Sequence, residues 1–211
     1  MSWLAFSSQL NLDECRNNAQ SHDDCRRLNA NRSVRFMNRP QSLAIWITGL
    51  PASGKSTIVS ALQPQLEGLG LAVEVLESDK VRRVITPIPT YSEAERDLFY
   101  RALAFTGQKL VANGVTVVFD ATASRRIYRD FARSAIPRFI EVAVECPLTT
   151  CMERDRKGTY QKGQRGESRT VPGFQSSYEA PINPDLRIDT TTTSSGDAAR
   201  QICDLVKARF L

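Results

Sequence analysis

The apolar positions of this chain fall into short continuous runs separated by stretches of helical period. The runs predict strands at residues 43–48, 72–76, 115–119, 139–145 and 186–189. Between them, apolar residues recur every three or four positions, which predicts helices over 55–67, 80–85, 126–135, 147–154 and 198–210. Ser92 and Glu95 form a capping-box pair that predicts the start of a further, long helix ending at Gly114. Alternating strands and helices predict an α/β fold with a mostly parallel sheet of about five strands covered on both faces.

Two details of this pattern are specific enough to be checked. Pro64 lies inside the first predicted helix, which we expect to kink or shorten there because proline removes a helical hydrogen bond. In the long helix, the period assigns one set of residues to the inner face: Leu98, Phe99, Ala102, Leu103, Thr106 and Leu110.

Residues 1–40 differ in composition from the rest of the chain. They are rich in Asn, Ser, Arg and Asp, with scattered apolar residues, and we interpret them as a polar N-terminal extension with a regulatory, dimer-covering or dispensable role. Cys15, His22 and Cys25 could be metal ligands, but no fourth ligand is nearby, so ordinary polar residues are the simpler interpretation. The remaining residues, 41–211, suit a single domain.

Composition narrows the class of protein. The 211 residues carry a net charge of +5, but basic residues between Arg82 and Arg169 are interleaved with acidic ones, which favours small phosphorylated ligands over nucleic acid. No apolar run is long enough for a membrane span, and the N-terminus lacks signal-peptide order, so we expect a cytoplasmic protein. Five cysteines without a C-x-x-C pair argue against a disulfide framework or structural zinc.

The first strand leads directly into a phosphate-binding motif, G-x-x-x-x-G-K-[ST]. Glycines allow the backbone N–H groups to curl around phosphate oxygens, and the following helix adds its positive dipole end. Lys55 can reach the terminal phosphates of ATP, and the Ser56 hydroxyl can ligate Mg²⁺. The predicted ATP-binding residues of this loop are Gly49, Leu50, Pro51, Ala52, Ser53, Gly54, Lys55, Ser56 and Thr57.

Carboxylates end the two strands expected beside this loop. Asp79 follows the second strand and Asp120 the third, at the edge of the sheet where α/β proteins bind ligands. Either could belong to the magnesium shell, and the sequence does not choose between them. The polar, basic stretch 155–184 is too long for an idle connection, so we expect a lid that closes over the phosphates and excludes water.

Several segments resemble adenylylsulfate kinases, which use ATP to phosphorylate the ribose 3′-hydroxyl of adenylylsulfate. They are GLPASGKST, VLESDKVR, FIEVAVECPLTTCMERDRKGTYQKGQRGE and YEAPINPDLRIDT, and the similarity covers about residues 42–210. The resemblance implies catalytic roles for Lys55 and Asp79, ATP contacts from Arg154 and Lys157, and a homodimer. It implies five acceptor-binding residues: Arg82, Arg96, Arg101, Lys162 and Tyr91, of which Tyr91 stacks on the substrate adenine.

The chain also departs from the family pattern. Phe99 stands at a usual asparagine, Ala102 at the second of two arginines, and Ala123 at a serine sometimes regarded as a phosphoserine intermediate. Ala123 excludes that covalent route and leaves direct in-line transfer. A second stacking phenylalanine of the family falls at Val171 or Phe174. The alternatives are a kinase of the same fold with another hydroxyl acceptor, a nucleotide-binding regulator without catalysis, and, more weakly, a polynucleotide kinase.

Overall fold

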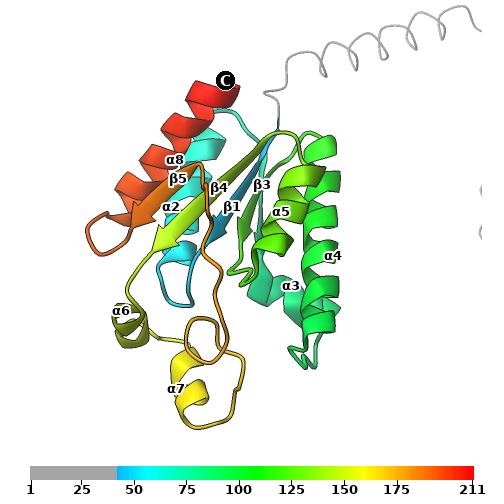
Figure 1. Ribbon diagram of the computed structural model, residues 1–211. Helices are drawn as coiled ribbons and strands as arrows, with labels where there is room; N and C mark the ends of the chain where they lie inside the picture. Colours follow the sequence, from blue (N-terminus) through cyan, green and yellow to red (C-terminus); the bar gives the residue numbers. More distant parts are fainter. Residues whose placement is uncertain (1–41) are drawn as a thin grey trace, which may run out of the picture. The chain divides into compact units, whose positions relative to one another are not determined.

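The computed structural model describes residues 42–211, which form a five-stranded parallel sheet between two layers of helices (Figure 1). The N-terminal extension and its Cys15, His22 and Cys25 lie outside the described residues. The strands are β1 (Ala44–Thr48), β2 (Val73–Glu77), β3 (Thr116–Asp120), β4 (Phe139–Glu145) and β5 (Leu186–Asp189). Their order across the sheet is β2-β3-β1-β4-β5, so β1 is central and the loop that follows it lies in the middle of one sheet edge.

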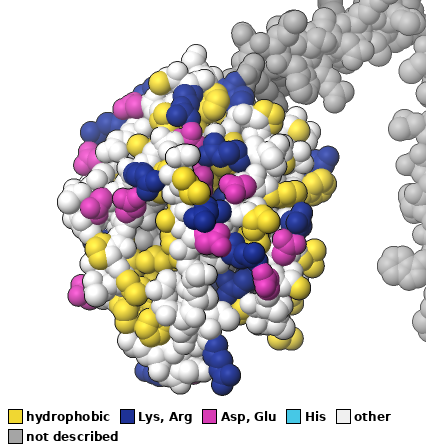
Figure 2. Space-filling view, viewed as in Figure 1, with side chains coloured by type: hydrophobic (Ala, Val, Ile, Leu, Met, Phe, Trp, Pro, Cys, Tyr) yellow, Lys and Arg dark blue, Asp and Glu magenta, His cyan; other side chains and the backbone are white. Residues whose placement is uncertain are grey.

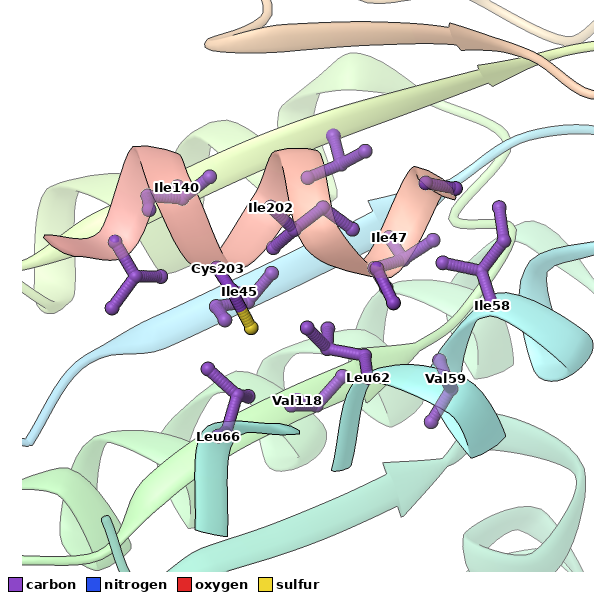
Figure 3. Packing of buried hydrophobic residues seen from close by; sticks show 14 of the residues in the cluster. Ile45, Ile47, Ile58, Val59, Leu62, Leu66, Val118, Ile140, Ile202 and Cys203 are labelled. Atoms are coloured by element: carbon purple, nitrogen blue, oxygen red, sulfur yellow. The ribbon is translucent and has the colours of Figure 1, made fainter. Parts of the chain in front are cut away.

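Alternate side chains of β1 pack against the two layers of helices. Ile45 and Ile47 face α2 (Lys55–Gly68) and α8 (Ser195–Phe210), as Figure 3 shows, and Trp46 faces the opposite layer. That opposite layer consists of α4 (Glu93–Ala112) and α5 (Arg126–Ala135), with α3 (Ser78–Ile85) at the end of the sheet (Figure 1). Both faces of the strand are therefore buried, which explains its uninterrupted apolar sequence.

Two expectations for the helices are wrong in part. Helix α2 continues through Pro64 to Gly68 without shortening, because Ile58, Leu62 and Leu66 pack on the core on both sides of the proline. On α4, Leu98 and Thr106 are exposed, whereas Tyr100, Ala104 and Gly107 are buried. The buried face of α4 therefore includes the small residues Ala104 and Gly107. Glycine is needed at position 107, because a Cβ there would lie only 2.2 Å from Cζ of Phe119.

The stretch 155–184, which the sequence predicts to be a lid and which is called the lid below, contains a short helix that the pattern did not predict, α7 (Thr159–Gln164), after α6 (Leu148–Glu153). Tyr160 anchors this helix, because its ring is buried beside Cys151 and Val171 and its hydroxyl donates to the Pro51 carbonyl at 3.0 Å. The lid is thereby attached to the loop after β1. Figure 1 shows α6 and α7 beyond the carboxyl ends of the strands.

Candidate active site

The loop between β1 and α2 has the backbone of a phosphate-binding loop. Gly54 has φ +100° and precedes the helix, and Ala52 adopts a left-handed φ of +57°. At Gly49 a Cβ would lie 2.5 Å from the Val144 carbonyl oxygen, so only glycine lets the chain turn this close to β4. The chain therefore curls around the N-terminus of α2, where backbone N–H groups and the helix dipole favour an anion.

Lys55 crosses this loop. Its Nζ atom donates to the carbonyl oxygens of Gly49 at 3.1 Å and Leu50 at 2.7 Å. Burial lowers the pKa of Lys55, while the charges of Asp120 and Asp79 oppose that shift. The ammonium is thus poorly solvated and close to two carboxylates, which suits a cation that stabilises a bound phosphate.

Asp120 ends β3 next to Ser56. Burial raises the pKa of Asp120, and a hydrogen bond from the Ser56 hydroxyl and the charge of Lys55 oppose that shift. A hydroxyl and a buried carboxylate at the N-terminus of the helix are the oxygen donors that Mg²⁺ takes in phosphate-loop enzymes. Residues 42–211 hold no group of three or more His, Cys, Asp and Glu side chains able to bind a metal by themselves. The set still fits Mg²⁺, which uses one or two carboxylates together with substrate phosphates.

Asp79 lies in the first turn of α3, immediately after β2. Its Oδ2 atom is 2.7 Å from Nζ of Lys157, which reaches it from the segment between α6 and α7. This hydrogen bond is the main cause of the raised pKa of Lys157, which is therefore charged at neutral pH. Both side chains are more than half exposed. A carboxylate predicted to act in catalysis and a lid cation are thus brought together.

Arg154, the other predicted lid contact to ATP, lies at the C-terminus of α6. Its guanidinium donates to the hydroxyl and to the carbonyl oxygen of Thr190, both at 3.2 Å. The Thr190 hydroxyl donates in turn to the Ser53 carbonyl at 2.9 Å. Sequence reasoning missed Thr190, since one threonine in the run 190–193 carries no signal of its own.

Three of the five predicted acceptor residues form one group. Arg82, Tyr91 and Arg96 lie together: the Arg82 and Arg96 guanidinium carbons are 5.2 and 5.4 Å from the centre of the Tyr91 ring. Arg96 also donates to the Thr170 carbonyl at 3.0 Å and so links this group to the lid. Tyr91 is 42% exposed, which leaves its ring accessible for stacking.

Arg101 and Lys162 are the other two predicted acceptor residues. Arg101 pairs with Asp97 at 2.7 Å and covers the Phe131 ring of α5. Lys162 is exposed on α7. Their roles stay predictions. Of the two candidates for a second stacking residue, Val171 is buried against Tyr160 whereas Phe174 is 40% exposed, so Phe174 alone offers an accessible ring.

Basic and acidic side chains are interspersed over the face shown in Figure 2. This distribution agrees with the alternation of charges along the sequence. A continuous basic surface, as nucleic-acid binding requires, is not seen on this face. Within residues 42–211, no helix combines the length and the apolar character needed to cross a membrane.

The model of the adenylylsulphate kinase family matches residues 41–189. The chain belongs to the adenylylsulfate kinase family. A probable adenylyl-sulfate kinase of Archaeoglobus fulgidus is 40% identical over 149 residues, which are 71% of this chain and 96% of that relative. The adenylyl-sulfate kinase of Rippkaea orientalis is 38% identical over 164 residues, 78% and 91% of the two chains.

Solved structures agree with this membership. The Mycobacterium tuberculosis APS kinase CysC, solved in complex with AMPPNP and APS, has a TM-score of 0.75 and 32% identity over 80% of this chain and 99% of its own. A hexameric APS kinase from Thiobacillus denitrificans has a TM-score of 0.61 and 26% identity over 81% of this chain and 29% of its own. The comparisons confirm the predicted family and the phosphate-loop kinase fold.

Proposed function

We propose that the protein transfers the γ-phosphoryl group of ATP to the ribose 3′-hydroxyl of adenylylsulfate. The main support for this proposal is that three residues with suitable chemistry come from segments at the same edge of the sheet. Lys55 lies in the phosphate loop, the charge of Asp79 opposes the lowered pKa of Lys55, and Arg82 follows Asp79 one helical turn later. Membership in the adenylylsulfate kinase family supports adenylylsulfate as the acceptor.

In this proposal each side chain has a separate task. Lys55 and the backbone N–H groups of the loop hold the β- and γ-phosphates, and Lys157 neutralises charge that develops during transfer. Asp79 orients the acceptor hydroxyl and takes its proton. The acceptor oxygen then forms a bond to the γ-phosphorus as the bond to ADP breaks. Ser56 and Asp120 would hold Mg²⁺, which supplies neutralisation of the phosphate charge when bound.

The lid completes the site. Tyr160 attaches it to Pro51 of the phosphate loop, Lys157 reaches Asp79, and Arg96 contacts Thr170. Phosphoryl transfer requires water to be excluded, since water would otherwise accept the phosphoryl group. A lid that contacts the donor loop, the proposed base and the acceptor group can close over all three.

Replacement of Asp79 by Asn tests the mechanism. The variant keeps the size and polarity of the side chain but cannot accept the hydroxyl proton. We expect kcat with adenylylsulfate to fall by about 10²–10⁴-fold with little change in the KM for ATP. An unchanged kcat would contradict the role of Asp79. Asp130→Asn, on α5 and outside the proposed site, is the control and should keep the wild-type rate.

The comparison with a hexameric family member supports assembly into an oligomer, and we extend the proposal to a homodimer. Sedimentation of the purified chain measures this directly. A monomer at the concentration used for the kinetic assays would contradict the homodimer without affecting the proposed reaction.

A further inference from the structure

Glu95 contacts both Arg82 and Tyr91 of the proposed acceptor group, although the sequence identified it only as the partner of Ser92 in a capping box. Ser92 does cap α4, because its hydroxyl accepts the Glu95 N–H at 3.3 Å. The Glu95 side chain does not complete the capping box. Its Oε2 atom instead accepts from both the backbone N–H and the hydroxyl of Thr90, each at 2.6 Å.

The other carboxylate oxygen of Glu95 holds Arg82. Its Oε1 atom lies 3.1 Å from Nη1 of Arg82, and only 11% of the Arg82 side chain and 13% of the Glu95 side chain are exposed. The hydrogen bonds from Thr90 are the main cause of the lowered pKa of Glu95. The carboxylate is therefore ionised at neutral pH, and the contact is a partly buried, charge-assisted hydrogen bond.

Phe99 fixes the face of the same guanidinium. The Arg82 Cζ atom lies 3.8 Å from the centre of the Phe99 ring, which is fully buried. An ion pair at one edge and a ring beneath the plane leave the guanidinium little freedom to rotate. Among the described residues, hydrogen-bond acceptors engage only its Nη1 atom, so its Nε and Nη2 donors are available to an anion.

Glu95 also supports the backbone of Tyr91, which adopts φ +54°. A non-glycine residue persists in this left-handed region only when its surroundings hold it there. Here the Tyr91 N–H donates to Glu95 Oε1 at 3.4 Å, and its carbonyl accepts from Nε of Arg96 at 3.0 Å. One carboxylate therefore sets both the arginine and the aromatic ring of the acceptor group.

We propose that Glu95 is a positioning residue of the acceptor site, which holds Arg82 and Tyr91 in their binding arrangement before the substrate arrives. The inference rests on the proposed function, because it assigns Arg82 to the anionic phosphosulfate and Tyr91 to the adenine of adenylylsulfate. A preorganised arginine and ring lose less side-chain entropy when the substrate binds, so Glu95 strengthens acceptor binding without touching the acceptor.

The test is the steady-state kinetics of Glu95→Gln, in which the side chain keeps its size but loses its charge. We expect the KM for adenylylsulfate to rise about tenfold, with the KM for ATP and kcat within about twofold of wild type. Glu93→Gln is the matched control, because Glu93 lies in the same helical turn but is 77% exposed and pairs with Arg125. Its two KM values should stay within about twofold of wild type.

Placing Glu95→Gln in an Arg82→Ala/Tyr91→Ala background distinguishes positioning from a general structural effect. If Glu95 acts through these two residues, it should raise the acceptor KM only about twofold further in that background. An unchanged acceptor KM in Glu95→Gln alone, an equal rise in both KM values, or a full tenfold further rise in the Arg82→Ala/Tyr91→Ala background would each overturn the positioning role. Absence of adenylylsulfate turnover in the wild-type enzyme would instead contradict the proposed function.

Discussion

Replacement of Arg129 by methionine removes the most buried cation of the described chain. Arg129 lies on α5 with 1% of its side chain exposed. Its Nε atom is 2.7 Å from Oε1 of Glu141, its Nη2 donates to the Glu179 carbonyl at 2.6 Å, and its Nη1 donates to the carbonyl of Ala123. One guanidinium thus ties α5 and β4 to the loop after β3 and to the end of the lid.

The expected loss of stability follows from these contacts. Removing one partner of a buried ion pair costs about 3–5 kcal/mol, because the remaining charge is left desolvated. Arg133 stays 3.4 Å from the other oxygen of Glu141 and compensates in part. We therefore expect the free energy of unfolding to fall by about 3 kcal/mol, which lowers the unfolding midpoint by roughly 6–12 °C in a chain of this length.

Urea unfolding followed by far-ultraviolet circular dichroism measures this loss. Arg126→Met is the matched control on the same helix, because Arg126 Nε lies 4.0 Å from Glu179 and its side chain is 42% exposed. The control should lose less than about 1 kcal/mol. A loss of unfolding free energy in Arg129→Met no larger than that in Arg126→Met would contradict a stabilising role for the buried ion pair.

Three further predictions concern the carboxylate at the predicted metal site, the lid and the core. Burial raises the pKa of Asp120, so the free energy of unfolding should fall as pH rises from the unfolded to the folded pKa. Asp120→Asn should remove this fall and raise the thermal unfolding midpoint at pH 7. Magnesium-dependent turnover should drop at the same time. A lower unfolding midpoint would contradict a carboxylate whose pKa is raised by burial. Lys157→Ala should reduce kcat. Its unfolding free energy, measured by calorimetry, should change by less than about 1 kcal/mol, because the pair of Lys157 with Asp79 is exposed. Gly107→Ala should cost about 1–3 kcal/mol in urea unfolding, since the new methyl group meets Phe119; no loss would mean that the ring moves freely.

Much of the fold follows from local patterns. Every predicted strand matches the observed one within one residue at each end; for β1, the predicted run 43–48 compares with Ala44–Thr48. The phosphate loop was also predictable, because its glycines and Lys55 lie within nine residues and their function depends on the local backbone. These features are encoded in short segments, so distant contacts change them little.

The sequence could not predict features that depend on distant packing. The inner face of α4 is rotated because Gly107 accommodates Phe119, a partner that periodicity does not identify. The same limit applies to Glu95, whose capping pattern was visible but whose contact with Arg82 depends on how α3 and α4 meet. The resemblance to family motifs implies an acceptor role for Arg101, which stays a prediction, but it could not show that the Arg101 guanidinium lies 5.1 Å from the centre of the Phe131 ring of α5.

The most direct test of the central claim is transfer of label from [γ-³²P]ATP to adenylylsulfate, followed by treatment of the product with a 3′-specific nucleotidase. We expect labelled nucleotide that loses its label to this enzyme, with no labelled protein, because Ala123 offers no hydroxyl for a phosphoryl intermediate. Label that stays in ATP, moves to another position of the nucleotide, or remains bound to the protein would contradict direct phosphorylation of the 3′-hydroxyl.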